Sequence, residues 1–394
     1  MKNVIIAGAA RTPVGAFLGG LASQSAVQLG EMAALAALQR AGLKASQVDE
    51  AIMGCVLQAG IGQNPARQIA MGIGVPKEVT AYSVNMVCGS GLKAIALARD
   101  SILLKRAAIV LAGGTESMSQ APHLIQQGRQ GNKLGSIEAI DSILHDALTD
   151  IFGQMHMGTT AENIAEHYQI SREDQDRFAL ESQQKCAMAM NKNLFQNEIA
   201  EVAIKSRKGE TIIHRDEHPR PDTSFEALSG LRPAFKKDGT VTAGNASGIN
   251  DGAACVVVAD EDSDVGRKID KAQAVRLIDC AVAGCAPETM GLGPIYAVRN
   301  LLEMTNIAAK DIDLWELNEA FAAQSIAVVR DLNLDTTKVN VNGGAIALGH
   351  PVGASGARIV VTLIHEMKRR NARYGIAALC IGGGMGIAIL LENI

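Results

Sequence analysis

Apolar residues follow two patterns along this chain, and the two patterns alternate. Short apolar runs predict strands, and they cover residues 81–87, 108–112, 253–259 and 312–317. Between them, apolar residues recur every three to four positions, which predicts helices. One such helical stripe follows residue 88 and consists of Leu92, Ile95, Ala96, Ile102 and Leu103. The alternation predicts an α/β fold.

Three blocks of sequence near the start of the chain return near its end at an almost constant offset. Residues 43–52 resemble residues 307–316, which lie 264 positions later. The other matched pairs are residues 89–91 with 353–356, and residues 108–114 with 377–383. A shared offset across three blocks indicates two copies of one α/β unit that flank a middle insertion.

This repeat predicts a division of the chain into three parts. They are an N-terminal half (1–118 and 250–270), an inserted loop domain (119–249) and a C-terminal half (271–394). In the more polar insertion, Ser171 is expected to cap a helix that has Asp174 in its first turn. We expect each half to be a mixed sheet covered by helices, with run 253–259 in the sheet of the first half. The two halves are then expected to pack in five alternating layers (αβαβα).

Composition and charge exclude several classes of function. The 394 residues carry a net charge of −4 and no long basic run, so nucleic acid is not expected as a partner. No apolar run approaches the roughly 20 residues that span a bilayer, so no membrane association is expected. The seven cysteines include no Cys-x-x-Cys pair. Neither a bound metal nor a disulfide framework is therefore predicted, and a cytoplasmic location is expected.

Cys88 stands where the apolar run 81–87 gives way to Gly89-Ser90-Gly91 and a predicted helix. The N-terminus of a helix carries partial positive charge, which lowers the pKa of a thiol and favours the nucleophilic thiolate. Cys88 is therefore a candidate nucleophile. The alternative is a buried structural cysteine, because free cysteine is among the most buried residue types.

Three other positions carry candidate chemistry. His350, between Gly349 and Pro351, lies on constrained backbone and suits a general base or an oxyanion donor. Asn318 follows the run 312–317 and can donate to an oxyanion, directly or through a water molecule. Cys380 ends an apolar strand before a glycine run. Each also has a plainer explanation, as a core histidine, a turn or cap residue, and a buried cysteine.

A dinucleotide site is a competing interpretation of the same segment. Gly89, Gly91 and Ala94 fit the fingerprint G-x-G-x-x-A, and Glu116 at the end of the next strand is then the candidate ribose ligand. Against this stand the internal position of the motif and Cys88, since a cysteine before the first glycine has no role in binding a pyrophosphate. We therefore favour the nucleophile over a nicotinamide site.

Four motifs in this order resemble the thiolase family, and within it the biosynthetic acetoacetyl-CoA branch, the acetyl-CoA acetyltransferases. The motifs are Cys88-Gly89-Ser90-Gly91, Asn318-Glu319-Ala320-Phe321, the run 349–356 around His350, and the run 380–386 that begins with Cys380. The resemblance extends over nearly the whole chain. It implies a thiolase-like fold of duplicated halves in five layers with an inserted loop domain.

The resemblance also implies an activity, the reversible Claisen condensation of two acetyl-CoA molecules to acetoacetyl-CoA and CoA. Cys88 is then the residue that becomes acetylated, His350 activates it, and Cys380 moves a proton to or from the substrate. One oxyanion is assigned to His350 and a water held by Asn318. The other is assigned to the N–H groups of Cys88 and Gly382.

The resemblance further implies CoA thioesters as substrates, no permanently bound cofactor and a homotetramer. Residues implied around the CoA arm are Leu148, His156, Met157, Arg220, Leu231, Phe235, Ala243, Ser247, Gly248, Met290, Ala320 and Phe321. Met157 is expected to close the acyl end of the site, which predicts a short substrate. The alternatives are a degradative 3-ketoacyl-CoA thiolase of broad chain length and a non-catalytic acyl-CoA-binding protein.

Overall fold

The internal repeat reappears as two related half-sheets in the computed structural model, which describes residues 3–206 and 209–394. In the N-terminal half the strand order is β4, β3, β5, β12, β1. Their bounds are Thr80–Val84 (β4), Glu50–Gly54 (β3), Ile109–Ser117 (β5), Asn250–Asp260 (β12) and Val4–Arg11 (β1), with the short strand Gly15–Ala16 (β2) beside β12. Strands β3, β4 and β5 are parallel to one another, whereas β12 is antiparallel to β5 and β1. The prediction that the run 253–259 joins this sheet is confirmed.

The C-terminal half has the same arrangement with its outermost strand reduced to a bridge. The order is β14, β15, β16, β13, and a single parallel bridge joins Trp315 of β14 to Val339. Bounds are Leu314–Leu317 (β14), Tyr374–Ile381 (β15), Met385–Asn393 (β16) and Val275–Gly284 (β13). β14 and β15 are parallel, and the other two pairs are antiparallel. Each strand therefore has a counterpart in the first half, except that Val339 stands in for β4.

The two half-sheets are not fully separate, which differs from the sequence-based expectation. β1 and β13 pair at Ile5 with Arg276 and at Ile6 with Val275, so hydrogen bonds join the strands into one ten-stranded sheet. The register of β1 against β12 then shifts between Ile6 and Gly8. A bulge bends a strand away from its neighbour, so the pairing with β13 ends there.

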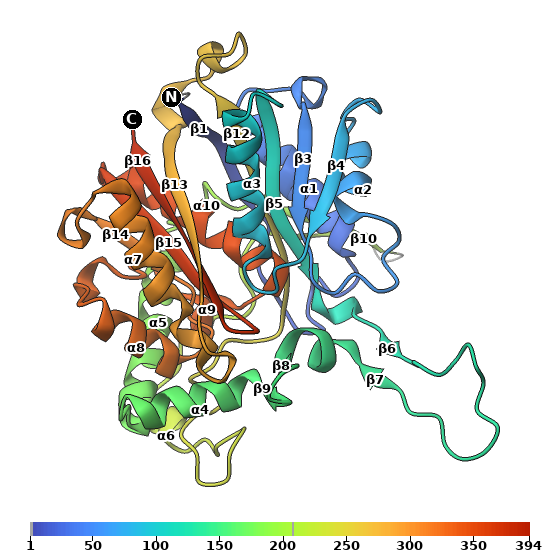
Figure 1. Cartoon of the computed structure of the whole chain (residues 1–394), viewed down its shortest axis with the longest axis vertical. Coiled ribbons are helices and arrows are strands. Elements are labelled where there is room, and N and C mark those ends of the chain that lie inside the picture. Colours follow the sequence, from blue (N-terminus) through green and yellow to red (C-terminus); the bar gives the residue numbers. More distant parts are fainter. Residues whose placement is uncertain (1–2, 207–208) are drawn as a thin grey trace.

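Helices complete the five expected layers (Figure 1). Helix α3 (Ser90–Leu103) and its counterpart α10 (Val352–Arg370) pack against each other between the half-sheets. The outer face of the first half-sheet is covered by α1 (Ala26–Arg40) and α2 (Pro65–Gly72), and that of the second by α7 (Gly293–Thr305) and α8 (Ala322–Asp331). Because strand side chains alternate, Ile6 faces the middle layer whereas Ile5 packs under α1.

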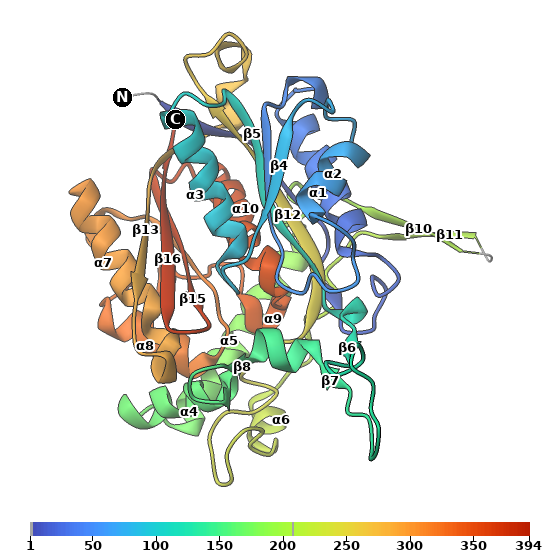
Figure 2. The same cartoon turned by 45° about the vertical axis from the view of Figure 1, so that its right-hand side comes forward.

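Most of the insertion lies at one end of the two halves, below them in Figure 1. It contains α4 (Met157–His167), α5 (Arg172–Asn191), α6 (Phe225–Ser229) and the short strands β8 (Thr149–Asp150) and β9 (Met155–His156). The hairpin of β10 (Val202–Ser206) and β11 (Gly209–Ile213) projects from the body (Figure 2), as does an arm with β6 (His123–Leu124) and β7 (Ile140–Asp141). The predicted cap of α5 is confirmed, because Ser171 Oγ accepts from the N–H of Asp174 (3.0 Å) and Asp174 Oδ2 accepts from the N–H of Ser171 (3.2 Å).

The described part of the chain contains neither a membrane-spanning helix nor a metal-binding cluster. None of its helices combines the length and the apolarity that a membrane span requires. None of its clusters of histidine, cysteine, aspartate and glutamate could hold a metal ion. All seven cysteines are unpaired.

Candidate active site

A cavity of about 390 Å³ lies where the middle layer meets the insertion. Its walls include Cys88 before α3, His350 before α10, and Cys380 in β15. Because α3 and α10 are counterparts in the repeat, the turns before them approach the same point from the two halves. The fold thus brings together three candidate residues that lie far apart in the sequence.

Cys88 lies in a tight turn, because β4 ends at Val84 rather than at residue 87 as the apolar run predicts. Val87 has a φ of +45°, and a β-branched residue in this left-handed region costs about 1–2 kcal/mol. The turn is held by Ser90, whose Oγ accepts from the N–H of Met86 (2.8 Å) and donates to the carbonyl of Val87 (2.6 Å). This geometry places Cys88 on the cavity wall.

Burial dominates the acidity of the Cys88 thiol. It raises the pKa of Cys88 to about 11, although the N–H groups of Gly382 and of Cys88 itself act in the opposite direction. The lowered pKa that we predicted from the start of a helix is therefore wrong for this cavity, since burial penalises the charged form more than the local donors stabilise it. A thiol in this state needs a base before it can attack a carbonyl.

The hydrogen bonds around His350 indicate which of its ring nitrogens carries the proton. Ser355 Oγ donates to the carbonyl of Pro351 (2.9 Å) and lies 2.6 Å from His350 Nδ1. A hydroxyl has one proton to donate; with that proton on the carbonyl of Pro351, we assign the ring proton to Nδ1, which then donates to Ser355. Among the described residues, the buried Nε2 has no hydrogen-bond partner, so its lone pair is available to accept a proton. Burial, followed by the charge of Arg358, lowers the pKa of His350 to about 4, so the ring is neutral near pH 7 and can accept a proton at Nε2.

Asn250 in β12 is a buried residue that holds the backbone of this histidine. Its Oδ1 accepts from the N–H of His350 and its Nδ2 donates to the carbonyl of Gly15, both at 2.9 Å. Gly349 has a φ of +101°, and a Cβ on it would lie 2.5 Å from the Asn250 amide. Sequence reasoning missed Asn250 and Ser355, because the fold determines which side chains contact His350. The spacing of Ser355, one helical turn into α10, was the available signal.

Cys380 lies in β15 and is almost fully buried. The sequence predicts that Cys380 ends its strand, whereas β15 continues one residue further, to Ile381, before the glycine run. Burial raises the pKa of Cys380, and the neighbouring Cys88 raises it further. Gly382 does not line the cavity, but its N–H approaches the Cys88 sulfur.

Asn318 follows β14 directly, and its backbone N–H donates to the carbonyl of Ala378 (3.0 Å). Its side-chain Oδ1 and Nδ2 are both buried, and neither has a hydrogen-bond partner in the described part of the chain, although the residue is not on the cavity wall. The next residue, Glu319, accepts from Ser182 Oγ (2.7 Å), Asn340 Nδ2 (2.8 Å) and the N–H of Ile346 (3.2 Å). These bonds tie the Asn318 turn to the segment that leads to His350.

Most residues predicted around the CoA arm line the cavity. They are Leu148, His156, Met157, Arg220, Phe235, Ala243, Ser247, Gly248, Met290, Ala320 and Phe321. Leu231 does not; it is 39% exposed and packs beside Gly244 instead. His156 caps α4, since its Nδ1 accepts from the N–H of Gly158 (3.0 Å), and its ring stacks on Phe235 at a centroid distance of 4.7 Å.

The cavity also includes residues that sequence reasoning did not single out. They are Met118, Leu144, Ala147, His218, Ala234, Ala246, Ile249 and Val352. Most are small or apolar, and nothing local distinguishes such residues from ordinary core positions. His218 carried a possible signal, since it stands two residues before Arg220 in a proline-rich loop.

Glu116 argues against the dinucleotide interpretation. It is fully buried, and its carboxylate accepts from the N–H groups of Val56 (3.0 Å), Leu57 (3.0 Å) and Gly353 (2.9 Å). A ribose therefore cannot reach it. Gly91 lies against α10, where a Cβ would meet the carbonyl of Gly353 at 2.9 Å, so the glycine turn serves helix packing.

Comparison with known proteins gives consistent similarities over the whole chain. The family model for the thiolase N-terminal domain matches residues 4–262, and that for the thiolase C-terminal domain matches residues 271–393. The chain is 52% identical to acetyl-CoA acetyltransferase of Paracoccus denitrificans over 393 residues, and 50% identical to the probable acetyl-CoA acetyltransferase of Escherichia coli. Each alignment covers 100% of both proteins.

Solved structures are also similar to this chain over its whole length. A crystal structure of the acetyl-CoA acetyltransferase of Bacillus anthracis has 43% sequence identity and a TM-score of 0.97, over 100% of this chain and 99% of that one. A crystal structure of human mitochondrial 3-ketoacyl-CoA thiolase has 45% identity and a TM-score of 0.96, over the same shares. The five-layer fold class predicted from the sequence is confirmed.

Proposed function

The chain belongs to the thiolase family, and from this premise we propose that it is an acetyl-CoA acetyltransferase that acts through an acetyl-Cys88 intermediate. The reaction is the reversible condensation of two acetyl-CoA molecules to acetoacetyl-CoA and CoA. The observation that carries the mechanism is the meeting of Cys88, Cys380 and a neutral His350 in one cavity. Full-length relatives with about 50% identity support the assignment of the activity.

In the first half of the proposed reaction, His350 Nε2 accepts the thiol proton of Cys88 as the sulfur attacks the thioester carbonyl. The tetrahedral oxyanion is stabilised by the N–H groups of Cys88 and Gly382. The C–S bond to CoA breaks, and CoA leaves as a thiol with the proton of Cys380, which becomes a thiolate. Cys88 then carries the acetyl group, and His350 keeps the proton that it took from Cys88. The raised pKa of Cys88 makes this base essential.

In the second half, the Cys380 thiolate removes an α-proton from a second acetyl-CoA, and the carbanion attacks the acetyl carbonyl on Cys88. A C–C bond forms, the bond to the Cys88 sulfur breaks, and His350 returns its proton to that sulfur, so both cysteines are thiols again. Asn318 supports this step, because its unpartnered buried amide suits a bound water that shares the enolate oxygen with His350. Two cysteines are needed because one thiol cannot hold an acyl group and act as a base together.

The CoA thioester is expected to enter past Arg220, whose exposed guanidinium suits the nucleotide phosphates. We propose a homotetramer, supported by the exposed apolar side chains of Ile125, Leu134 and Ile137 on the β6–β7 arm. We also propose a cytoplasmic location, supported by the unpaired cysteines. Sedimentation of the purified chain tests the tetramer.

Rates of thiolysis test the function. Acetoacetyl-CoA should be cleaved with CoA much faster than a ten-carbon 3-ketoacyl-CoA. Equal or faster turnover of the long substrate would favour the degradative alternative, which draws support from the similarity to human mitochondrial 3-ketoacyl-CoA thiolase. Absence of turnover with both substrates would favour a non-catalytic acyl-CoA-binding protein.

A further inference from the structure

One wall of the cavity is a long loop with little regular structure, formed by residues 228–248. It contributes Ala234, Phe235, Ala243, Ala246, Ser247 and Gly248 to the lining. Ala234 and Ala243 are exposed at the mouth, whereas Ala246 is buried deeper. The wall therefore runs from solvent towards the candidate catalytic residues, along the path that the CoA arm of a substrate would take.

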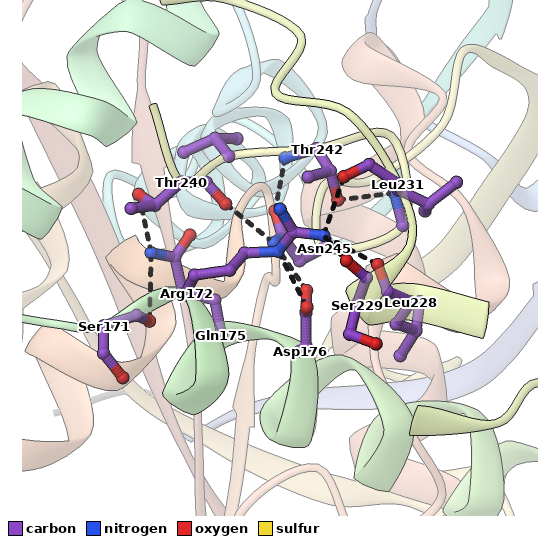
Figure 3. Close-up of polar contacts among 12 residues, drawn as sticks. Ser171, Arg172, Gln175, Asp176, Leu228, Ser229, Leu231, Thr240, Thr242 and Asn245 are labelled. Atoms are coloured by element: carbon purple, nitrogen blue, oxygen red, sulfur yellow. Dashed lines mark hydrogen bonds and ion pairs between the residues drawn. The ribbon is translucent and has the colours of Figure 1, made fainter. Parts of the chain in front are cut away.

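An ion pair on α5, formed by Arg172 and Asp176, binds this loop on the side away from the cavity lining (Figure 3). Arg172 Nε donates to Asp176 Oδ2 (2.7 Å), while its Nη2 donates to the carbonyls of Leu228 (2.7 Å) and Leu231 (3.0 Å). Arg172 thus closes the first turn of the loop onto α5. A guanidinium presents several donors in one plane, so one side chain can bind a carboxylate and two carbonyls together.

The second oxygen of Asp176 holds the other end of the loop. Asp176 Oδ1 accepts from Asn245 Nδ2 (2.9 Å), and Asn245 also bonds the carbonyl of Thr240 (3.1 Å) and the N–H of Thr242 (2.8 Å). Asp176 and Asn245 are 1% and 0% exposed. Each polar atom of the Asn245 amide is therefore used to fix the 240–245 turn.

From this turn the hydrogen bonds continue to the cavity. The carbonyl of Asn245 accepts from the N–H of Ala322 (2.9 Å), and the N–H of Ser247 donates to the carbonyl of Ala320 (3.0 Å). The carbonyl of Val241 accepts from the N–H of Ala234 (2.9 Å), which closes the loop on itself. Neither Arg172 nor Asp176 lines the cavity, so the pair acts on it only through these segments.

We propose that Arg172 and Asp176 are positioning residues that preorganise the 228–248 wall for the CoA arm of the substrate. This inference rests on the proposed function. It predicts that the Arg172–Asp176 pair raises kcat/KM for substrates that extend along the 228–248 wall, and hardly changes kcat/KM for substrates that occupy only the catalytic end of the cavity. A short acyl carrier such as N-acetylcysteamine lacks the nucleotide and most of the pantetheine arm, so it distinguishes these two cases.

The test uses Asp176→Asn, which preserves shape. The carboxylate accepts from Arg172 with one oxygen and from Asn245 with the other, so an amide at this position must direct its NH₂ group at one of these two donors. The matched control is Glu173→Gln on the same helix, where Glu173 pairs with Arg177 in the open, with side chains 62% and 64% exposed. An exposed pair with this spacing contributes little.

Thiolysis is measured with acetoacetyl-CoA and with acetoacetyl-N-acetylcysteamine, and folding is checked from the Tm. For Asp176→Asn we expect kcat/KM to fall about tenfold or more with the CoA substrate, mainly through KM, and less than about threefold with the short one. Glu173→Gln should change neither by more than about twofold. Arg172→Lys, which keeps the charge but loses the planar fork, provides the same comparison if Asp176→Asn does not fold.

Two results would overturn the inference: an equal loss with both carriers, which indicates a general structural role, or no loss with the CoA substrate in a folded variant. Failure of the proposed function is distinguished by the unmodified protein, because it would then cleave neither acetoacetyl thioester or would turn over the ten-carbon 3-ketoacyl-CoA at least as fast as acetoacetyl-CoA. If the unmodified protein is active and Asp176→Asn loses the same activity with both carriers, the proposed function stands and only the positioning role is rejected.

Discussion

Replacing Ser355 by alanine should slow acylation of Cys88 by removing the group that sets the proton on His350. The hydroxyl accepts from His350 Nδ1 at 2.6 Å, and its own proton is committed to the carbonyl of Pro351. Without it, the Nδ1–H group is buried and has no acceptor. The other tautomer, with the proton on Nε2, cannot accept a proton from Cys88 in the way that the mechanism requires.

The size of the effect follows from the burial of this pair. His350 is 6% exposed and Ser355 is 0% exposed. Leaving a buried donor without a partner costs about 1–3 kcal/mol. If this cost falls on the base-competent tautomer, its population and the rate of acylation drop by a factor of about 5 to 150. The Asn250 bond to the backbone N–H of His350 remains, so the loop itself should stay in place.

The assay is the rate at which acetyl-CoA adds one acetyl mass to the protein in a rapid-quench experiment. Ser101→Ala is a matched control, because Ser101 is a buried serine on α3, the counterpart of α10. Its Oγ has no hydrogen-bond partner within residues 3–206 and 209–394. It should acetylate at the unmodified rate. Folded Ser355→Ala protein that acetylates within about twofold of the unmodified rate would refute the role assigned to this hydrogen bond.

The remaining predictions concern the two cysteines and the acyl pocket. Cys88→Ala should lose thiolysis, condensation and the acetyl mass together; a stable label on Cys380 in an active Cys88→Ala variant would contradict the assignment. Cys380→Ser should lose condensation while Cys88 still acquires label slowly, and a complete failure to acetylate would show that the roles are not separate. Burial raises the pKa of Cys88 to about 11. The rate at which iodoacetamide alkylates Cys88 without substrate should therefore rise about tenfold per pH unit from about pH 7 to 10. A plateau of this rate by about pH 8 would mean that the dipole of α3 affects the thiol more than burial does. Met157 lies beside Gly382, because a Cβ at Gly382 would be 3.5 Å from Met157 Sδ. Met157→Ala should therefore improve kcat/KM for a six-carbon 3-ketoacyl-CoA relative to acetoacetyl-CoA. An unchanged ratio would show that Met157 does not determine the chain length of the substrate.

Local pattern was enough to predict the class of fold and the family. The duplicated α/β unit follows from residues 43–52 and 307–316, whose counterparts β3 and β14 occupy equivalent places in the two half-sheets. Cys88, His350 and Cys380 were identified because each stands in a short motif of glycines. Such motifs describe backbone turns, and turns depend mainly on adjacent residues.

Only the tertiary structure decided how these residues behave. A helix start predicts a lowered pKa for Cys88, but burial by the other half and the insertion raises it, because desolvation depends on everything that surrounds the sulfur. The free Nε2 of His350 follows from Ser355, and the fixed wall beyond it follows from Asp176, which is 69 residues from Asn245 along the chain. The sequence by itself determined which groups could react. Packing between distant segments determined their protons, their partners and the shape of the space between them.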